Sequence, residues 1–228
     1  MTAARIPLDG EMQLLGLMPN ASNYTFLARI PDGGEGALVI YKPRAGETPL
    51  WDFPEGTLCL REVAAWEVSD ALGWSLVPET VLRDGPHGIG SAQRFIAFDP
   101  EQHYFTLRET RLEDFRDVAL LDAIINNADR KGGHCLLGHD GELRLIDHGV
   151  CFHPEPKLRT VVWDFAGEPV DAGLLDTLAS ARDAILERTG SLLDPLESKA
   201  LGARIDGLLA RGTYPVPGAE RHYPWPPV

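Results

Sequence analysis

The sequence predicts an α+β protein of two lobes, in which an antiparallel sheet with one helix is followed by a mainly helical part. The first hundred residues alternate short apolar runs with turns rich in Gly and Pro, a pattern typical of antiparallel strands. Helical periodicity dominates from residue 112 onward. The 228 residues are enough for one large domain or two small lobes that share a cleft. We therefore expect lobes at residues 1–97 and 98–212, followed by a Pro-rich tail at 213–228.

Five strands and one helix are expected in the first lobe, in the order β-β-β-α-β-β. The first three strands fall at residues 11–17, 24–30 and 37–42, and the turn PDGGEG before the third carries glycines that hairpin turns favour. Pro43 ends the third strand, and residues 44–57 have the Gly and Pro content of a loop. The helix and the last two strands follow at residues 58–72, 76–82 and 89–97.

Helices and one tight hairpin are expected in the second lobe. Residues 112–126 carry a broad apolar face typical of a buried helix, and the strands HCLLG and LRLID follow, joined by HDGE. Two further helices are predicted at residues 171–189 and 194–211, punctuated by Gly190 and Pro195. The tail TYPVPGAERHYPWPPV has five prolines, so it is expected to be an extended strap or a mobile segment.

Composition and charge argue against several classes of function. The formal net charge of −13 disfavours non-specific binding to nucleic acid or to an anionic membrane surface. No apolar run approaches about 18 residues, so no membrane span is predicted. The N-terminus MTAARIPLDG lacks the apolar core of a signal peptide. Cys59, Cys135 and Cys151 show no paired spacing, which indicates reduced thiols in a cytoplasmic protein.

The segment NNADRKGGHCLLGHDGELRLIDHG, residues 126–149, carries the residues best suited to chemistry. Asp129 follows the predicted helix, His134 lies five residues on, and Asp147 ends the second strand of the predicted hairpin. A hairpin brings the ends of its two strands together, so groups thirteen residues apart can share one metal ion. Two carboxylates and a potential metal ligand suit phosphoryl transfer, which needs a group to orient the nucleophile and ligands for the metal on ATP.

A matching phosphate-binding half is predicted near the third strand. Lys42 ends that strand in VIYKP, where a long ammonium side chain can reach bound phosphates. Glu62 on the following helix can pair with Lys42 and hold it in place, and Glu67 is the competing partner. Small residues in the loop MPNASN would let backbone N–H groups approach phosphate oxygens, as Gly-rich loops do. The candidate residues of this loop are Ala21, Ser22 and Asn23.

The order of six motifs is similar to that of the phosphatidylinositol 3- and 4-kinase superfamily, above all its type II 4-kinase branch and the small bacterial kinase-like proteins grouped with it. The motifs are VIYKP, LREVAAWEVSDALG, LVPETVL, IGSAQRFI, NNADRKGGH and LIDHGVCF. The resemblance covers roughly residues 14–165, and the joint order of the motifs is more specific than any one of them. It implies a compact protein-kinase-like fold that binds ATP with Mg²⁺ or Mn²⁺.

By this resemblance, individual residues take the roles of the family's ATP site. Lys42 is implied to hold the ATP phosphates, with Glu62 as its helix partner. Asp129 is implied to be the catalytic aspartate and Asp147 the metal-binding aspartate. His134 takes the place of a metal-binding asparagine, five residues after the catalytic aspartate. The segment implied to meet adenine through its backbone includes Gln93, Phe95 and Ile96.

The sequence departs from the family pattern in three places. His134 replaces the usual Asn, and Lys131 stands where many members have His. Since imidazole is a good ligand for Mn²⁺ and a poor one for Mg²⁺, His134 predicts a preference for Mn²⁺ and weaker binding below about pH 6.5. Alternatively, His134 only forms hydrogen bonds across the loop. The segment after Asp147 has Lys157 and Arg159 as its obvious basic residues, so a lipid is the least favoured acceptor.

The residues and the resemblance together predict an ATP- and divalent-metal-dependent phosphotransferase. Its acceptor is expected to be a hydroxyl group of a protein or of a small molecule. Two alternatives stay open. The first is a catalytically weak or inactive nucleotide-binding scaffold, a pseudokinase, which the substitution at His134 supports. The second is a nucleotidyltransferase on the same fold.

Overall fold

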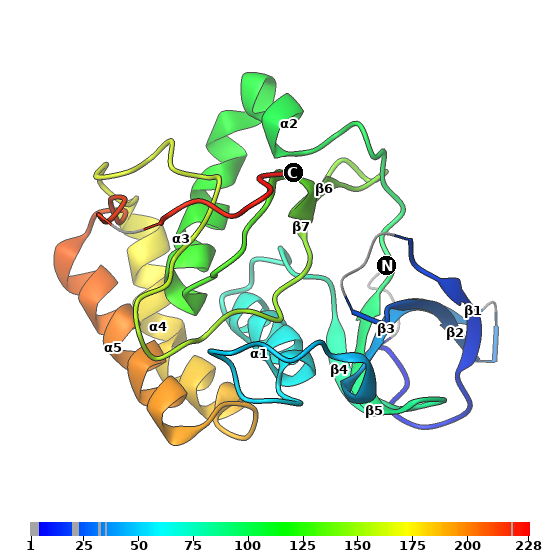
Figure 1. The fold of residues 1–228 in the computed structure, drawn as a ribbon. Coiled ribbons are helices and arrows are strands. Elements are labelled where there is room, and N and C mark those ends of the chain that lie inside the picture. Colours follow the sequence, from blue (N-terminus) through cyan, green and yellow to red (C-terminus); the bar gives the residue numbers. More distant parts are fainter. Residues whose placement is uncertain (1–4, 20–22, 32, 35, 220) are drawn as a thin grey trace.

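The N-terminal half of the chain is an antiparallel sheet with one helix. The computed structural model describes residues 5–19, 23–31, 33–34, 36–219 and 221–228 (Figure 1). The elements of this half are β1 (Gln13–Leu17), β2 (Phe26–Ile30), β3 (Ala37–Pro43), α1 (Leu58–Ala71), β4 (Thr80–Gly85) and β5 (Gly88–Arg94). Their order confirms the predicted β-β-β-α-β-β pattern.

The sheet has the strand order β1-β2-β3-β5-β4, with every neighbouring pair antiparallel. Side chains of β3 alternate between two environments, because successive residues of a strand point to opposite faces. Val39 and Tyr41 are buried in a small core shared with β2. Ile40 and Lys42 point the other way and line a cleft. The predicted strand at 76–82 is displaced, because the backbone of Leu76 bonds to Leu145 instead of joining the sheet.

The C-terminal half is mainly helical, as predicted. Its elements are α2 (Tyr104–Arg111), α3 (Phe115–Ile125), β6 (Cys135–Leu137), β7 (Leu143–Leu145), α4 (Ala172–Thr189) and α5 (Pro195–Arg211). The helix expected at 112–126 begins only at Phe115, because Leu112–Asp114 form a 3-10 turn that connects it to α2. The sequence analysis missed α2 itself. The helix has only eight residues, two of them buried, so its apolar pattern is too short to mark a helix in the sequence.

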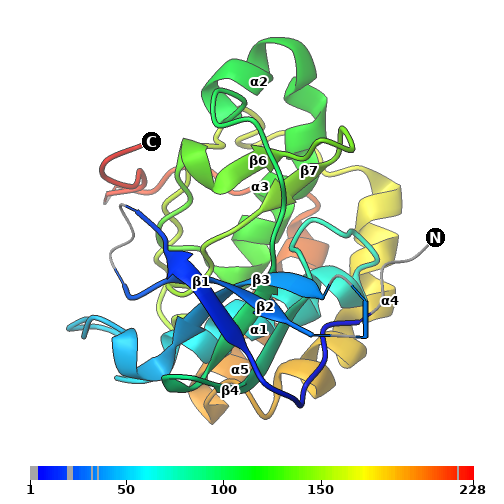
Figure 2. The ribbon, with the colours of Figure 1, turned by 90° about the vertical axis from the view of Figure 1, so that its right-hand side faces the viewer.

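Helix α1 lies between the sheet and α4 (Figures 1 and 2). Its inner face joins the main core, which continues through α3, α4 and α5. Arg61 of α1 forms a buried ion pair with Glu197 of α5. Arg188 of α4 binds Glu67 and Asp70 of α1, each at 2.6 Å. These contacts fix α1, and therefore the side chains it carries toward the cleft, against the helical half.

The described part of the tail, residues 213–219 and 221–228, is an extended strap, one of the two forms expected. Its base is fixed by Tyr214, which is buried and bonded through its backbone to Glu168. Farther on, the carbonyl of His222 accepts hydrogen bonds from the backbone of Thr160 and from the indole of Trp163. The strap ends beside the loop before β6, where the Gly132 N–H donates to the Pro227 carbonyl at 2.7 Å (Figure 1).

No helix of the described part of the chain is long and apolar enough to cross a membrane. The three cysteines are free and buried, as the sequence predicted for reduced thiols.

Candidate active site

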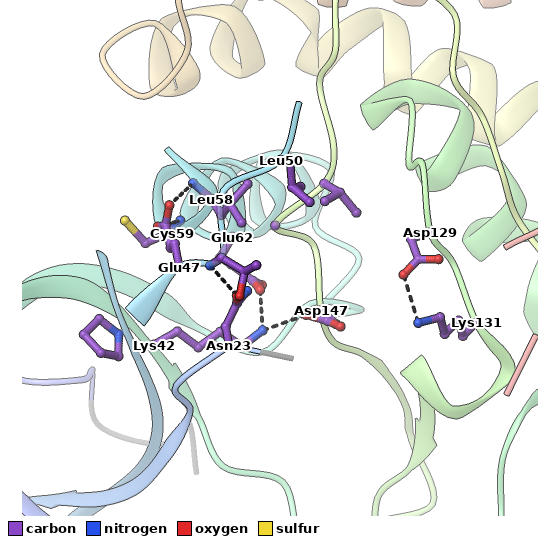
Figure 3. A pocket seen from close by; sticks show the side chains of 14 residues that line it. Asn23, Lys42, Glu47, Leu50, Leu58, Cys59, Glu62, Asp129, Lys131 and Asp147 are labelled. Carbon is purple, nitrogen blue, oxygen red and sulfur yellow. Dashed lines mark hydrogen bonds and ion pairs between the residues drawn. The ribbon is translucent and has the colours of Figure 1, made fainter. Parts of the chain in front are cut away.

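Three charged side chains from separate elements meet at the floor of the cleft. Lys42 ends β3, Glu62 comes from α1, and Asp147 follows β7. The Lys42 ammonium contacts Glu62 Oε1 and lies 2.9 Å from Asp147 Oδ1 (Figure 3). The other oxygen of Glu62 accepts the backbone N–H of His148 at 3.0 Å. The partner of Lys42 is thus Glu62, whereas the competing Glu67 is bonded to Arg188.

The charges in this cluster stabilise one another. Burial alone would lower the pKa of the Lys42 ammonium, but Asp147 and Glu62 outweigh burial and raise the pKa above its ordinary value. The nearby Lys42 ammonium holds the pKa of Asp147 well below its usual range, although burial acts in the opposite direction. Asp147 has φ = 63°, a left-handed conformation that Asp tolerates better than most residues. Both groups are therefore charged at neutral pH.

Asp129 is positioned by the loop that leaves α3. The helix ends at Asn126, which adopts the left-handed conformation typical of such ends. The Asp129 N–H donates to the side chain of Asn127, which in turn is held by Asp122 at 2.9 Å. The Asp129 carboxylate lies 3.1 Å from the Lys131 ammonium. Burial raises the pKa of Asp129, and Lys131 opposes the increase.

A buried arginine ties the loop of Asp129 to the loop of Asp147. Arg130 binds Asp122 and donates to the carbonyl of Ile146 at 3.0 Å. It also lies 2.7 Å from Nε2 of His148. Since a guanidinium only donates, His148 Nε2 is the acceptor. The sequence analysis missed this network, because its members are joined by long-range contacts that no fixed spacing predicts.

His134 lies beside Asp147 with both ring nitrogens engaged. Its Nε2 is 3.3 Å from Asp147 Oδ2, and its Nδ1 accepts the backbone N–H of Lys131 at 3.3 Å. An accepting Nδ1 carries no hydrogen, so in the neutral ring Nε2 must carry it. Burial lowers the pKa of His134 to about 4, which keeps the ring neutral near pH 7. The sequence predicted that the neutral imidazole is lost below about pH 6.5. With this lower pKa, the neutral form persists to about pH 4.

Two cavities meet at the charged cluster. The first, of about 310 Å³, extends under the sheet, and the second, of about 230 Å³, extends toward α1 and Asp129. Four residues line both cavities, namely Asn23, Lys42, Lys131 and Asp147. Lys42 and Asp147 of the charged cluster therefore lie at the boundary of the two cavities, and Figure 3 shows them in the wall of the second.

The cavities separate the predicted site residues into two groups. The first cavity is lined by Gln93, Phe95, Ile96 and His134, together with the apolar Ile40. The second cavity is lined by Glu62 and Asp129. Two predicted phosphate-loop residues, Ala21 and Ser22, lie outside the described residues.

The strand predicted to meet adenine is partly engaged within the sheet. The Phe95 N–H donates to the carbonyl of Leu38 at 3.0 Å. The Gln93 side-chain amide donates to the hydroxyl of Thr80 at 3.0 Å. The Phe95 N–H is therefore engaged with the sheet. Gln93, Phe95 and Ile96 all line the first cavity, and contact of this segment's backbone with adenine stays a prediction.

A metal in this site would depend on a bound phosphate. Among the described residues, no group of three or more His, Cys, Asp or Glu side chains could hold a metal ion. Asp147 and His134 form only a pair, with their nearest atoms 3.3 Å apart. The Asp147 carboxylate fits Mg²⁺ or Mn²⁺ on a nucleotide, because such ions are commonly held by one or two carboxylates, phosphate oxygens and water.

Comparisons by sequence found three relatives to report. No family model matches the chain. It is 39% identical over 259 aligned positions to Protein Rv2133c of Mycobacterium tuberculosis, covering 96% of this chain and 92% of that protein. It is 31% identical to phosphatidylinositol 4-kinase gamma 4 of Oryza sativa subsp. japonica, covering 82% of this chain and 40% of that protein. Phosphatidylinositol 4-kinase gamma 3 of Arabidopsis thaliana is 28% identical over 116 positions, 47% of this chain and 19% of that protein.

A comparison of structures supports the same architecture. The fold is similar to that of the Helicobacter pylori proinflammatory kinase CtkA, with a TM-score of 0.55 over 90% of this chain and 93% of that chain. The sequences are 14% identical, so this similarity concerns the fold alone. It confirms the predicted kinase-like arrangement of an N-terminal sheet and a C-terminal helical part. The chain spans less than half the length of either plant relative.

Proposed function

Since this chain belongs to the family of Protein Rv2133c and is a distant homologue of the plant phosphatidylinositol 4-kinases gamma, we propose that it is an ATP- and divalent-metal-dependent phosphotransferase. The observation that carries the proposal is the position of Lys42, Glu62 and Asp147 at the junction of two cavities, one of which contains Asp129. The first cavity would hold the nucleotide. The second would hold the acceptor, a hydroxyl of a protein or of a small molecule.

Lys42 would neutralise the phosphates of the nucleotide. Its ammonium is already charged and oriented by Glu62, so little reorganisation is needed when phosphates replace its contact with Asp147. The base would pack against the apolar wall that includes Ile40 and Ile96. Asn23 lines both cavities and would face the phosphate chain between them.

Asp147 would hold the metal, with the nucleotide phosphates completing its coordination. When bound, Mg²⁺ or Mn²⁺ neutralises the charge that develops on the transferred phosphoryl group. His134 is the candidate second ligand by distance, but ligation would need a free lone pair on Nε2. That requirement would place the hydrogen on Nδ1, facing the Lys131 N–H. The hydrogen bonds therefore favour the alternative in which His134 donates to Asp147 and orients it.

Asp129 would orient the acceptor hydroxyl and take its proton. As the acceptor oxygen bonds to the γ-phosphorus and the bond to the β–γ bridging oxygen breaks, the hydroxyl proton passes to the carboxylate. Burial raises the pKa of Asp129, which makes the carboxylate a better proton acceptor. Lys131 lies between the two cavities and would balance the negative charge near the transferred group.

The names of the plant relatives raise the question of a lipid acceptor, which two observations disfavour. Lys157, one of the two obvious basic residues after Asp147, is bonded to Asp52 at 2.6 Å with both side chains largely buried. It is therefore not available to an inositol phosphate. The net charge of −13 gives no attraction to anionic lipids.

Replacing Asp129 by Ala tests the proposal. We expect phosphoryl transfer, measured with γ-labelled ATP, to fall by about 10²- to 10⁴-fold. The dissociation constant for ATP, measured by calorimetry, should change little, because Asp129 lines the second cavity and not the first. Asp183→Ala is the matched control, since the Asp183 side chain is 95% exposed on α4. An equal loss of binding and transfer in Asp129→Ala would count against the assigned role.

A nucleotide-binding scaffold is the second candidate. The hydrogen bonds of His134 favour it, because they make His134 a donor to Asp147 and not a second ligand of the metal. Thermal unfolding with ATP and Mg²⁺ or Mn²⁺, followed by a turnover assay, distinguishes the two functions. Stabilisation without ADP formation would favour the scaffold. If α-labelled ATP is used and the label appears in a product other than free nucleotide, the reaction is nucleotidyl transfer instead.

A further inference from the structure

A further cavity lies on the helical half, between α5 and the loop at residues 153–158. Its volume is about 390 Å³, larger than either cavity of the candidate active site, and none of its lining residues belongs to them. Much of its wall is apolar, with prolines and leucines from the loop, from α5 and from the start of the tail. These residues are Pro154, Pro156, Leu158, Leu208 and Pro215.

One wall of this cavity carries a cation that lacks a counter-ion. Arg204 donates from Nε to the Ile124 carbonyl at 3.0 Å and from Nη1 to the His153 carbonyl at 3.2 Å. Its Nη2 is buried, with no partner among the described residues. No described carboxylate forms an ion pair with Arg204, and Glu197, which acts on it through space, is itself bonded to Arg61.

Arg204 is a half-buried guanidinium without an ion pair. Arg83 also lacks one, but all three of its nitrogens donate to backbone carbonyls, whereas Nη2 of Arg204 has no partner among the described residues. Buried charges are normally paired, because leaving water costs more than isolated hydrogen bonds return. The sequence has 34 acidic residues against 21 Lys and Arg, so counter-ions are plentiful. Burial lowers the pKa of Arg204 to about 10, yet the group still stays charged at neutral pH. A positive charge is therefore kept in an apolar wall.

A second arginine lines the same cavity. Arg211 is the last residue of α5, seven positions after Arg204, and a spacing of two helical turns places both on one face. Its guanidinium lies back along the helix, close to Gly207 and thus toward Arg204. Two arginines and an apolar wall therefore line one open cavity, with Nη2 of Arg204 covered within that wall.

We propose that this cavity binds a small amphipathic anion, with one carboxylate or phosphate group and an apolar body of a few carbons. The anionic group would pair with the guanidinium groups of Arg204 and Arg211, which suit planar carboxylates and phosphates. The apolar body would cover Leu158, Leu208 and the neighbouring prolines. The site is separate from the nucleotide cleft and does not depend on the proposed transfer reaction.

The bound anion would touch a loop that also reaches the active site. Asn126, which lines the cavity, donates to the carbonyls of His153 and Glu155 and accepts the Lys157 N–H. The side chain of Lys157 bonds to Asp52 in the loop between β3 and α1. This chain of contacts gives the site a physical connection to the second cavity.

A titration followed by ¹H–¹⁵N NMR tests the proposal with the full chain. The probes are octanoate, octyl phosphate and 1-octanol, which share the apolar body and differ in the head group. We expect saturable shifts around Ala203 and Arg204 with at least one of the two anions, and at least about tenfold weaker binding of the neutral alcohol. The comparison of the two anions identifies the preferred head group.

Variants of the two arginines test their role in binding the anion, and a third variant is the control. Arg204→Gln and Arg211→Gln should each weaken anion binding by about tenfold or more. Arg211→Gln serves if Arg204→Gln does not fold, since Arg204 also holds two backbone carbonyls. Arg182→Gln, which removes a partly exposed arginine paired with Asp206, should bind normally. The proposal would be overturned if octanol bound as well as the anions, or if the folded variants bound the anions as the wild type does. It would also be overturned if the shifts were confined to the nucleotide cleft, or if no saturable shift appeared at about 10 mM anion.

Discussion

His134 shows how hydrogen bonds can decide a residue's chemistry. Ligating histidines usually donate their second ring N–H to a carboxylate or a carbonyl. In this chain the second nitrogen, Nδ1, instead accepts an N–H from Lys131. In the opposite tautomer, the N–H at Nδ1 would face the Lys131 N–H, so that two donors would meet. The lone pair at Nε2 would face the Asp147 carboxylate, so that two acceptors would meet. The arrangement therefore favours a hydrogen-bond donor to Asp147 over a metal ligand.

The tautomer of His134 can be measured directly. Long-range ¹H–¹⁵N correlation of the imidazole should show hydrogen on Nε2 and none on Nδ1. Addition of Mg²⁺ and a non-hydrolysable ATP analogue should leave this pattern unchanged, because Asp147 and the phosphates would supply the ligands. A hydrogen that moves to Nδ1 when the metal binds would instead indicate that His134 ligates it, as the sequence first suggested.

The low pKa of His134 also predicts how stability depends on pH. The folded ring has a pKa of about 4, against about 6.5 for an unfolded histidine. Between these values the unfolded chain binds a proton that the folded chain does not, so the free energy of unfolding falls as the pH falls from about 6.5 to about 4. The loss reaches up to about 3 kcal/mol at the lower end.

Urea unfolding at several pH values measures this dependence, with His134→Asn as the comparison. The variant lacks the titrating ring, so its stability should fall less than that of the wild type over the same range. His148, whose pKa burial also lowers, is present in both proteins; His134 makes the smallest contribution to that shift, so His148 has little effect on the difference. Parallel losses in the two proteins would show that His134 is not the group responsible.

Among the secondary-structure elements, α1 determines the geometry of the site. It carries Glu62 toward Lys42 on one side and is tied to the helical half on the other. Arg61 and Glu197 form the most buried of these ties, with side chains 1% and 4% exposed. Since α1 cannot move away without breaking this pair, the contact between Lys42 and Glu62 is formed before any nucleotide binds.

Breaking the buried tie should be costly. Glu197→Gln leaves the Arg61 charge uncompensated in the interior, so we expect a loss of about 3–5 kcal/mol in the free energy of unfolding. Asp206→Asn is the control, since it removes an exposed ion pair to Arg182 and should cost less than about 1 kcal/mol. Similar losses in the two variants, measured by urea unfolding, would mean that the buried pair does not stabilise α1.

The elements differed in how well local patterns predicted them. Strands β2 and β3 lie within a residue or two of their predictions, because alternation and turn residues mark strand positions. Helix α5 begins at Pro195, where Asp194 and Glu197 form a capping box visible in the sequence. Helix α2 was missed because its stability comes from tertiary contacts, including Tyr104 and Arg108 bound to Asp164.

In the whole molecule, the site is assembled from distant parts of the chain. The roles of Lys42, Glu62, Asp129 and Asp147 were inferred from short motifs, and the described structure brings Lys42, Glu62 and Asp147 into contact. Local patterns gave no sign of the second cavity, of the Arg130 network or of the contact between the strap and Gly132. Each of these depends on pairings across the fold, and sequence spacing carries no information about such pairings.

The most direct test of the central claim is an ATP titration by calorimetry in the presence of Mg²⁺, comparing the wild type with Lys42→Met. The account predicts one nucleotide per chain for the wild type and at least about tenfold weaker binding for the variant. The reason is that Lys42 lines both cavities, where its ammonium would meet the phosphates of the nucleotide. No binding by the wild type, or equal binding by a folded Lys42→Met variant, would contradict it.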